Sequence, residues 1–221
     1  ITYTLSDDGK LVISGTGSIA DDAFAGNTKI TSVVISEGVT GIGSGAFTGC
    51  TNLTSVTIPE GVTTIDGMTF GNCTSLTSVT IPGTVTSIEV QAFWNCSSLT
   101  SITIPASVTS IGSGVFQGCT SLTSVKLSEG LTRIGDQTFG RCNALETIEI
   151  PASVASIGNG AFKNCAKLRS IRCYANSSTW QPRYICDSNT TVYYSYNPNH
   201  THSYKSHVIK MSGGTHSGSE E

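Results

Sequence analysis

The sequence has 221 residues, of which 12% are charged and 38% hydrophobic, and its net charge is −3 at neutral pH. Such a chain lacks the basic surface that displaces counterions from DNA or RNA, so nucleic-acid binding is not expected. No apolar run approaches the ~20 residues that cross a bilayer, so membrane insertion is not expected either. Charge is graded along the chain: residues 1–125 hold two basic and eight acidic residues, and residues 126–221 hold ten basic and seven acidic ones.

Residues 1–29 are predicted to form an N-terminal capping coil. The chain opens with ITYTL, whose alternating apolar and hydroxyl side chains predict a strand. Further on, Val12, Ile19 and Phe24 lie 23 residues before Ile35, Ile42 and Phe47. This spacing predicts a degenerate coil that caps the N-terminal end of a stack of repeats.

Residues 30–167 contain six complete repeats of 23 residues. The segments LTSVTIP, LTSVTIP, LTSITIP, LTSVKLS and LETIEIP begin at Leu53, Leu76, Leu99, Leu122 and Leu145. A phenylalanine and a cysteine recur with the same period, in Phe47, Phe70, Phe93, Phe116, Phe139, Phe162 and in Cys50, Cys73, Cys96, Cys119, Cys142, Cys165. A fixed period of this length is typical of a solenoid, in which each coil buries its apolar side chains against its neighbours.

The second coil illustrates the structure expected for each repeat. Val56 and Ile58 are two residues apart, which predicts a strand with one buried face. Pro59-Glu60-Gly61 predicts a turn, because proline lacks an N–H and glycine allows positive φ. The segment 67–73 buries two side chains three residues apart, which predicts a helical or 3₁₀ turn. The fold class expected is therefore an α/β repeat solenoid, a right-handed stack with short parallel strands.

The period fails after Cys173, and residues 168–194 are predicted to form a C-terminal cap. Trp180, Tyr184 and Tyr193 are candidates for side chains that cover the last coil. From residue 195 to 221 the chain is polar, which predicts a tail or a linker.

The repeat resembles the BspA-type leucine-rich repeats of bacterial surface proteins. The pattern LxxIxIPxxVxxIGxxAFxxC occurs almost unchanged in residues 30–50 and 145–165, and the resemblance covers about residues 5–175. It implies a secreted or cell-surface module that binds a host or microbial partner, and the family has no shared catalytic residues to carry over.

The cysteines of the repeat are expected to be buried thiols. Their side chains should run parallel into the core, and so they neither face one another as in a disulfide nor converge as in a zinc site. Cys173 and Cys186 lie outside this column, and they could pair within the cap. No cofactor or metal is indicated by the sequence.

Catalytic residues are not indicated either. The first histidine is His200, so no Ser-His-Asp or Cys-His arrangement can form in the repeats. Asp66 and Glu89 share a column and invite comparison with a cation site or a glycosidase pair. Two solvated loop carboxylates are the favoured interpretation.

Candidate binding residues are those that vary between repeats. The first set surrounds an exposed tryptophan and comprises Met68, Val90, Gln91 and Trp94, since tryptophan is common at binding hot spots. The second set lies at the basic end of the chain and includes Lys126, Arg141 and Arg172. The sequence therefore predicts an extracellular, adhesin-like module that binds a protein or glycan without catalysis. The alternative is a structural spacer or an accessory module that presents another domain.

Overall fold

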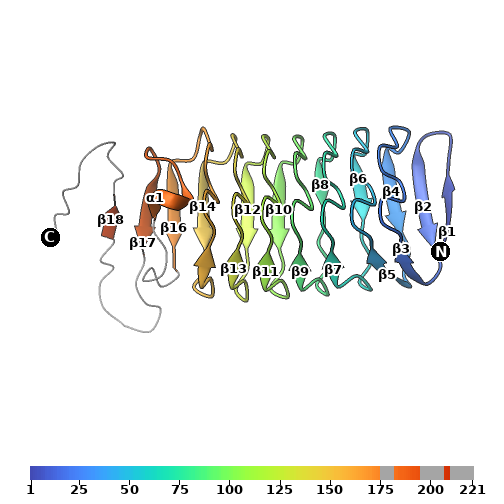
Figure 1. Ribbon diagram of the computed structural model, residues 1–221, viewed down its shortest axis with the longest axis horizontal. Helices are drawn as coiled ribbons and strands as arrows, with labels where there is room; N and C mark the ends of the chain where they lie inside the picture. The colour runs from blue at the N-terminus through green and yellow to red at the C-terminus, as the bar shows by residue number, and fades with distance from the viewer. Residues whose placement is uncertain (175–181, 195–206, 210–221) are drawn as a thin grey trace.

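The computed structural model describes residues 1–174, 182–194 and 207–209. The coils stack side by side along one axis, with β1 at one end and β17 and β18 at the other (Figure 1). Parallel strands of successive coils therefore run across the long axis of the molecule. The predicted solenoid of 23-residue coils is confirmed.

Each coil has up to two short strands, one on each side of the stack. The first strands are β2 (Lys10–Ser14), β4 (Ser32–Ile35), β6 (Ser55–Thr57), β8 (Ser78–Val79), β10 (Ser101–Ile104), β12 (Ser124–Leu127), β14 (Thr147–Ile150) and β16 (Ser170–Cys173). The second strands are β3 (Gly17–Ile19), β5 (Val39–Ile42), β7 (Thr64–Ile65), β9 (Ser87–Ile88), β11 (Ser110–Ile111), β13 (Arg133–Ile134) and β15 (Ser156–Ile157). The ends add β1 (Thr2–Leu5), α1 (Pro182–Ile185), β17 (Thr191–Tyr194) and β18 (His207–Ile209).

Parallel pairing between coils keeps the period of the sequence. Val33 pairs with Val56, and Ile65 with Ile88, so each residue lies beside the residue 23 positions later. The second strands from β7 to β15 form one continuous sheet. The first strands form three sheets among the described residues, because the ladder is interrupted between β8 and β10 and between β12 and β14.

The proline turn joins the two strands of a coil as predicted. The backbone N–H of Val62 donates to the carbonyl of Pro59 at 3.2 Å, and the same bond links Val85 to Pro82. Such a bond from the fourth residue of a turn to the first reverses the chain within four residues. The coil can therefore present an inward side chain from both of its strands.

The helical turn predicted in each coil is wrong, and with it the α/β assignment. Between Met68 and Cys73 the backbone N–H groups alternate in direction. Phe70 donates to Ala92 of the next coil at 2.8 Å, whereas Gly71 donates to Met68 of its own coil at 2.8 Å. A helix uses its N–H groups within its own segment, so a segment that sends every second one to a neighbour cannot be helical. The segment is a run of turns that forms a third hydrogen-bonded edge of the stack.

The phenylalanine column forms a continuous stack of rings through the core. Neighbouring rings from Phe24 to Phe162 lie 5.4 or 5.5 Å apart, with interplanar angles of 14° or less. The six rings from Phe47 onward have no exposed area. The core is therefore periodic, and each ring contacts the coil before it and the coil after it.

Removing one ring from the middle of this stack is expected to destabilise the protein. Phe93 lies 5.4 Å from Phe70 and 5.5 Å from Phe116. Phe93→Ala should lower the free energy of unfolding by about 3–5 kcal/mol in urea denaturation, because a cavity forms between two rigid neighbours. Phe24→Ala is the matched control, and it should cost less because Phe24 is already partly exposed. Equal losses at the two positions would contradict the argument that the cost follows the burial of the ring.

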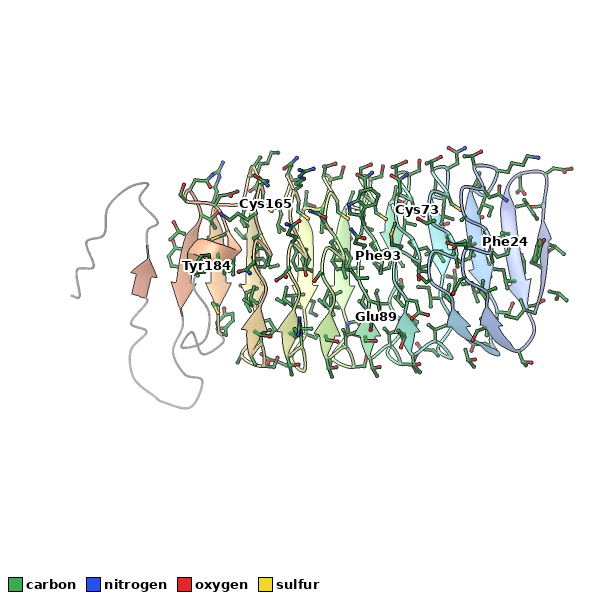
Figure 2. All side chains as sticks on the ribbon, viewed as in Figure 1. Phe24, Cys73, Glu89, Phe93, Cys165 and Tyr184 are labelled. Atoms are coloured by element: carbon green, nitrogen blue, oxygen red, sulfur yellow. The ribbon has the colours of Figure 1, made fainter. Side chains whose placement is uncertain are left out.

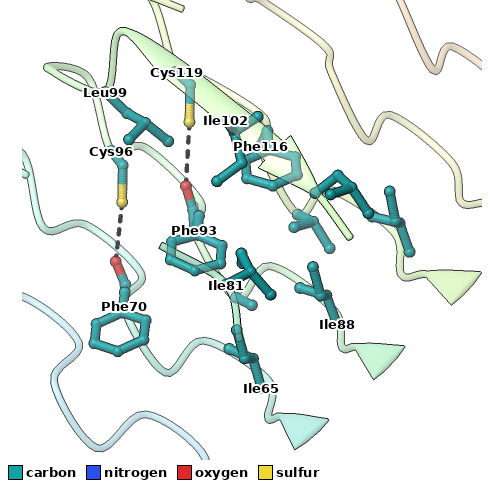
Figure 3. Close-up of a cluster of buried hydrophobic side chains, with 14 of the residues drawn as sticks. Ile65, Phe70, Ile81, Ile88, Phe93, Cys96, Leu99, Ile102, Phe116 and Cys119 are labelled. Carbon is teal, nitrogen blue, oxygen red and sulfur yellow. Dashed lines mark hydrogen bonds between the residues drawn. The ribbon is translucent and has the colours of Figure 1, made fainter. Parts of the chain in front are cut away.

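The buried cysteines have a hydrogen-bonding role that the sequence did not reveal. The Sγ of Cys96 donates to the carbonyl of Phe70, 3.2 Å away in the preceding coil, and Cys119 donates likewise to Phe93 at 3.3 Å (Figure 3). Cys50, Cys73, Cys142 and Cys165 make the equivalent bond at 3.0–3.3 Å. The thiol column is thus a ladder of weak donors parallel to the ring stack, and the predicted burial is confirmed.

The N-terminal coil keeps the ring column but shifts its first strand by one residue. Phe24 stacks on Phe47, and Ile19 pairs with Ile42, as the 23-residue spacing predicts. In the first strand, however, Ile13 and not Val12 lies beside Ile35. Leu11 and Ile13 are fully buried, and the shift is absorbed by an irregularity between Gly17 and Ser18. The two-residue alternation of a strand outweighs the repeat spacing here.

Among the described residues, the C-terminal coil is covered by aliphatic side chains and not by Tyr184 and Tyr193, two of the predicted aromatic ones. Val192 and Ile185 have at most 1% of their area exposed, whereas Tyr193 is 36% and Tyr184 is 50% exposed. Val192 pairs with Ile171 across the β16–β17 ladder, so Tyr193 points to the opposite face. Trp180 lies outside the described residues, as do residues 195–206 and 210–221.

Candidate binding surface

The turn edge of the stack carries the side chains that differ most between coils. Two positions in each turn have positive φ, and glycine occupies them in several coils, such as Gly45 and Gly49 with φ of 64° and 70°. Elsewhere other residues adopt the same conformation. Among the described residues these are Asp22, Met68, Asn72, Gln91, Asn95, Gln137, Arg141 and Asn164, with φ between 52° and 62°.

Four of these residues carry a cost that glycine would avoid. Asp and Asn tolerate the left-handed region because their short side chains bond locally, but Met68, Gln91, Gln137 and Arg141 have no such advantage. A longer side chain held there costs about 1 kcal/mol or more. Folding alone does not explain these residues, since glycine supports the same turn in neighbouring coils.

The first predicted set of ligand-binding residues is brought together on this edge. The side chains of Met68, Gln91 and Trp94 are half-buried, and that of Val90 is 49% exposed. The N–H of Met68 donates to the carbonyl of Val90 at 3.0 Å, and that of Trp94 to Gln91 at 2.9 Å. The four residues therefore form one patch across two adjacent coils.

Two hollows extend this patch toward the C-terminal end. The first has a volume of about 170 Å³ and is lined by Val90, Gln91, Ser113, Gly114, Gln117, Asp136 and Gln137. The second has a volume of about 470 Å³ and is lined by Gln137, Asn159, Gly160, Lys163 and Tyr184. Gln137 lines both, and its carboxamide accepts a hydrogen bond from that of Gln117. Figure 2 shows Tyr184 near the C-terminal end of the stack.

These residues define one surface, here called the variable turn strip. All members except Tyr184 of α1 project from columns that differ between coils, and Tyr184 lines the same hollow as Gln137 and Lys163. The strip comprises Met68, Val90, Gln91, Trp94, Gln117, Gln137, Arg141, Lys163 and Tyr184. Gln137 was missed as a candidate from the sequence, although it lies 46 residues after Gln91 in the same column. The signal in the sequence was a large residue at a position where the preceding and following coils have glycine, Gly114 and Gly160.

The second predicted set, the basic residues, is divided between two edges. Lys126 lies in β12 and Arg172 in β16, on the exposed face of the first strands. Glu149 of β14 lies between them and forms an ion pair with Arg172 at 3.3 Å. Arg141 belongs to the turn edge. The grouping of these three cations in sequence therefore does not produce one basic surface.

The carboxylates Asp66 and Glu89 lie at the start of the turn edge in adjacent coils. The pKa of Asp66 is raised, first by partial burial and then by the negative charges of Glu89 and Asp21. No group of three or more potential metal-ligating side chains occurs in residues 1–174, 182–194 and 207–209. The pair has the character of loop carboxylates that repel one another.

Cys173 and Cys186 are fully buried at the C-terminal end. Cys173 pairs with Ile150 in the β14–β16 ladder, and Cys186 forms a bridge to Phe162. The structure describes both side chains as thiols, and burial raises the pKa of Cys186 to about 11. A disulfide between them therefore remains a prediction, which the intact mass under non-reducing conditions tests.

Comparison with known proteins places the chain in one family. The family described as BspA type leucine rich repeat region matches residues 17–117 and 86–207, with six copies of the repeat. No curated protein sequence matches the chain significantly. Within the described part of the structure, no helix is long and apolar enough to cross a membrane.

Three solved structures share the fold. A leucine-rich repeat protein of T. pallidum is 29% identical, with a TM-score of 0.64 over 76% of this chain and 87% of that one. A leucine-rich cell surface protein of Faecalibacterium prausnitzii is 34% identical, with a TM-score of 0.66 over 79% of this chain. This chain spans 53% of that protein. A protein of Bacteroides ovatus, 20% identical with a TM-score of 0.60 over 86% of this chain and 76% of that one, shares the fold. The chain belongs to the BspA-type leucine-rich repeat family.

Proposed function

We propose that this chain is an extracellular, adhesin-like binding module that recognises a protein or glycan of a host or microbial surface through the variable turn strip. Modules of this repeat family generally mediate interactions. The description of the similar F. prausnitzii structure as a cell surface protein supports a secreted or surface-attached setting.

One observation carries this proposal. Met68, Gln91 and Gln137 hold the left-handed conformation at a column where Gly45, Gly114 and Gly160 would do so without strain. Backbone strain retained against a cheaper alternative points to a role other than folding. The strained residues lie in or beside the hollows, so contact with a ligand is the role proposed.

The chemistry of the strip suits a polar ligand with some apolar surface. Trp94 and Tyr184 supply aromatic area, and the carboxamides of Gln91, Gln117 and Gln137 supply both donors and acceptors. Few precisely placed polar groups beside aromatic side chains are typical of recognition sites. A leucine-rich repeat solenoid typically has no catalytic role.

The experiment is a binding screen followed by surface-specific variants. The module is tested against arrays of glycans and extracellular-matrix proteins, and the affinity for any ligand found is measured for Trp94→Ala and Gln137→Ala. Each change is expected to weaken binding at least about tenfold, as at a hot spot. Thr57→Ala, on the exposed face of β6, is the control and should leave affinity unchanged.

Other results would reject the proposal. If Lys126→Gln and Arg172→Gln weakened binding while the Trp94 and Gln137 variants did not, the ligand would lie on the strand face. If no ligand were found in either array, the spacer role would be favoured over the binding role.

A further inference from the structure

The two hollows of the variable turn strip are copies of one another, displaced by two coils. The first is lined by Gln91, Ser113, Gly114 and Gln117, and the residues 46 positions later, Gln137, Asn159, Gly160 and Lys163, line the second. Hydrogen-bonded neighbours in such a stack lie about 4.8 Å apart, so equivalent points of the two hollows are about 10 Å apart. One extended ligand can therefore reach both.

Each hollow lies over a glycine between longer side chains. Gly114 and Gly160 both have φ of 64°, and the coil before each has glutamine in the same column. A Cβ atom on Gly160 would lie 3.2 Å from the Cγ atom of Lys163 and 3.4 Å from that of Gln137. On Gly114 it would lie 3.2 Å from the Cγ atom of Gln91. The glycines thus leave the space that the flanking stems enclose, and their alternation with glutamine gives the hollows a period of two coils.

The second hollow differs from the first in charge. Lys163 takes the place of Gln117 and is half-buried, so its stem packs against the coil while its ammonium group stays in water. Of the carboxylates that the structure describes, none lies within ion-pair distance of Lys163. The carboxylate of Asp136 lines the first hollow and not the second. An anionic group is therefore favoured in the second hollow and disfavoured in the first.

The backbone donors of this edge are already used between coils. The N–H of Gly114 donates to the carbonyl of Asp136 at 2.8 Å, and that of Gln137 donates to the carbonyl of Asn159 at 2.9 Å. A peptide that adds to a protein as an extra strand needs a row of free backbone groups. Recognition at the hollows must therefore rest on side chains.

The side chains of the hollows suit a sugar. A carboxamide holds a donor and an acceptor side by side, which matches two neighbouring hydroxyl groups, and Gln137 and Asn159 each supply one. Tyr184 lines the second hollow and is 50% exposed, so its ring can pack against the C–H face of a sugar ring. The volume of this hollow, about 470 Å³, is within the range of small-molecule sites.

We propose that the variable turn strip binds an oligosaccharide of at least three sugars, with a carboxylated sugar in the second hollow and a neutral sugar in the first. The carboxylate bonds to the ammonium group of Lys163, and the neutral sugar brings no negative charge to Asp136. Sugars two positions apart in an extended chain are separated by about the two-coil distance of 10 Å. This ligand class rests on the proposed function, since it assumes that the strip is the binding surface.

The first test measures the contribution of the carboxylate. The probes are two trisaccharides with a terminal carboxylated sugar, sialyllactose and glucuronosyl xylobiose, and their uncharged methyl esters. In calorimetry at least one acid should bind, and its ester should bind at least about tenfold more weakly, because it loses a charge-assisted hydrogen bond. Lys163→Gln installs the residue of the first hollow, and it should weaken binding of the acid by a similar factor without changing that of the ester. Lys167→Gln removes an equal charge from an exposed residue of the same coil, and it should change neither.

The second test asks whether one ligand occupies both hollows. Gln91→Gly removes a wall of the first hollow, and it should not impair folding because Gln91 has φ of 57°. It should weaken binding of the trisaccharide several-fold but leave binding of the free acidic monosaccharide, followed by NMR titration, unchanged. Gly160→Gln fills the second hollow with the side chain that Gln137 has in the same column, and it should abolish binding of both. Circular dichroism checks that the variants are folded.

Several results would overturn this proposal. One is equal binding of an acid and its ester, and another is a Gln91→Gly variant that weakens the trisaccharide no more than the monosaccharide. If neither trisaccharide bound while the arrays yielded another ligand sensitive to Trp94→Ala, the strip would recognise a different class, such as an acidic peptide. The proposed function would then stand and this ligand class would fall. If the arrays also yielded no ligand, both would fall.

Discussion

Raising the pH from 7 to about 9.5 is expected to destabilise this protein strongly, because the thiol column cannot ionise inside the stack. Burial is the main cause that raises the pKa of every column cysteine, to about 11 for Cys50 and about 12 for Cys165 and further for the inner ones. In the unfolded chain a cysteine titrates near 8.5. Below that pH the protonated column contributes its full stability.

The sign and size of the effect follow from proton linkage. As the pH rises above about 8.5, the unfolded state loses thiol protons that the folded state keeps, so the free energy of unfolding falls. Each buried thiol contributes a loss of about 1.4 kcal/mol per pH unit, until the pH reaches its folded pKa. The combined loss from six such thiols over one pH unit exceeds half of a typical free energy of unfolding.

Urea denaturation at several pH values, in the presence of a reductant, measures this loss. A variant in which Cys73, Cys96 and Cys119 are replaced by alanine retains three of the six column thiols and Cys186, whose pKa is also raised. Its pH slope should therefore be about four-sevenths of that of the parent. Its stability at pH 7 will be lower because of the cavities, but the slope is independent of that offset. An unfolding free energy that stays constant from pH 7 to 9.5 would contradict a protonated, solvent-excluded column.

The sequence was sufficient to predict the repeat because the core residues obey one period. The positions of Phe93 and Cys96 hold phenylalanine and cysteine in all six repeats, always at the same spacing. Such columns of identical apolar side chains can be buried only if the coils stack on one another. Their burial and their neighbours then followed from the 23-residue offset. The contact between Phe70 and Phe93 is an example.

The local backbone of the turn could not be predicted in the same way. Two buried residues three apart, such as Phe70 and Cys73, are equally compatible with a helical turn and with successive β-turns. The two conformations differ in the direction of alternate backbone N–H groups. That direction depends on the neighbouring coil, so the sequence of a single repeat does not indicate it. The same dependence hid the one-residue shift in β2.

The candidate site was predicted in part. The variable columns identified the patch of Met68, Val90, Gln91 and Trp94, which the structure places together. The basic residues were grouped by their position in the chain, although strand and turn columns lie on different edges. Gln137 and its hollows depended on the left-handed backbone, a property of the turn that the column pattern does not show.

Deleting a whole coil is expected to do less harm than deleting half of one. Removal of the 23 residues 77–99 joins Leu76 to Thr100 and leaves every column in register, so a shorter stack should fold. Its cooperative urea transition should have an m value reduced in proportion to the surface lost. Removal of the 12 residues 77–88 retains more of the chain but takes out β8 and β9, which supply both sides of one coil.

The half-coil deletion should abolish cooperative unfolding, because the remaining segment cannot pass around the core. Phe93 would have no route to its place between Phe70 and Phe116, and the ladder from Ile65 to Ile88 would be lost. Nearest-neighbour coupling in a solenoid requires every coil to present a complete interface to the next. Far-UV circular dichroism and urea denaturation of the two deletions distinguish the cases. If the 12-residue deletion were the more stable of the two, the 23-residue coil would not be the folding unit of this stack.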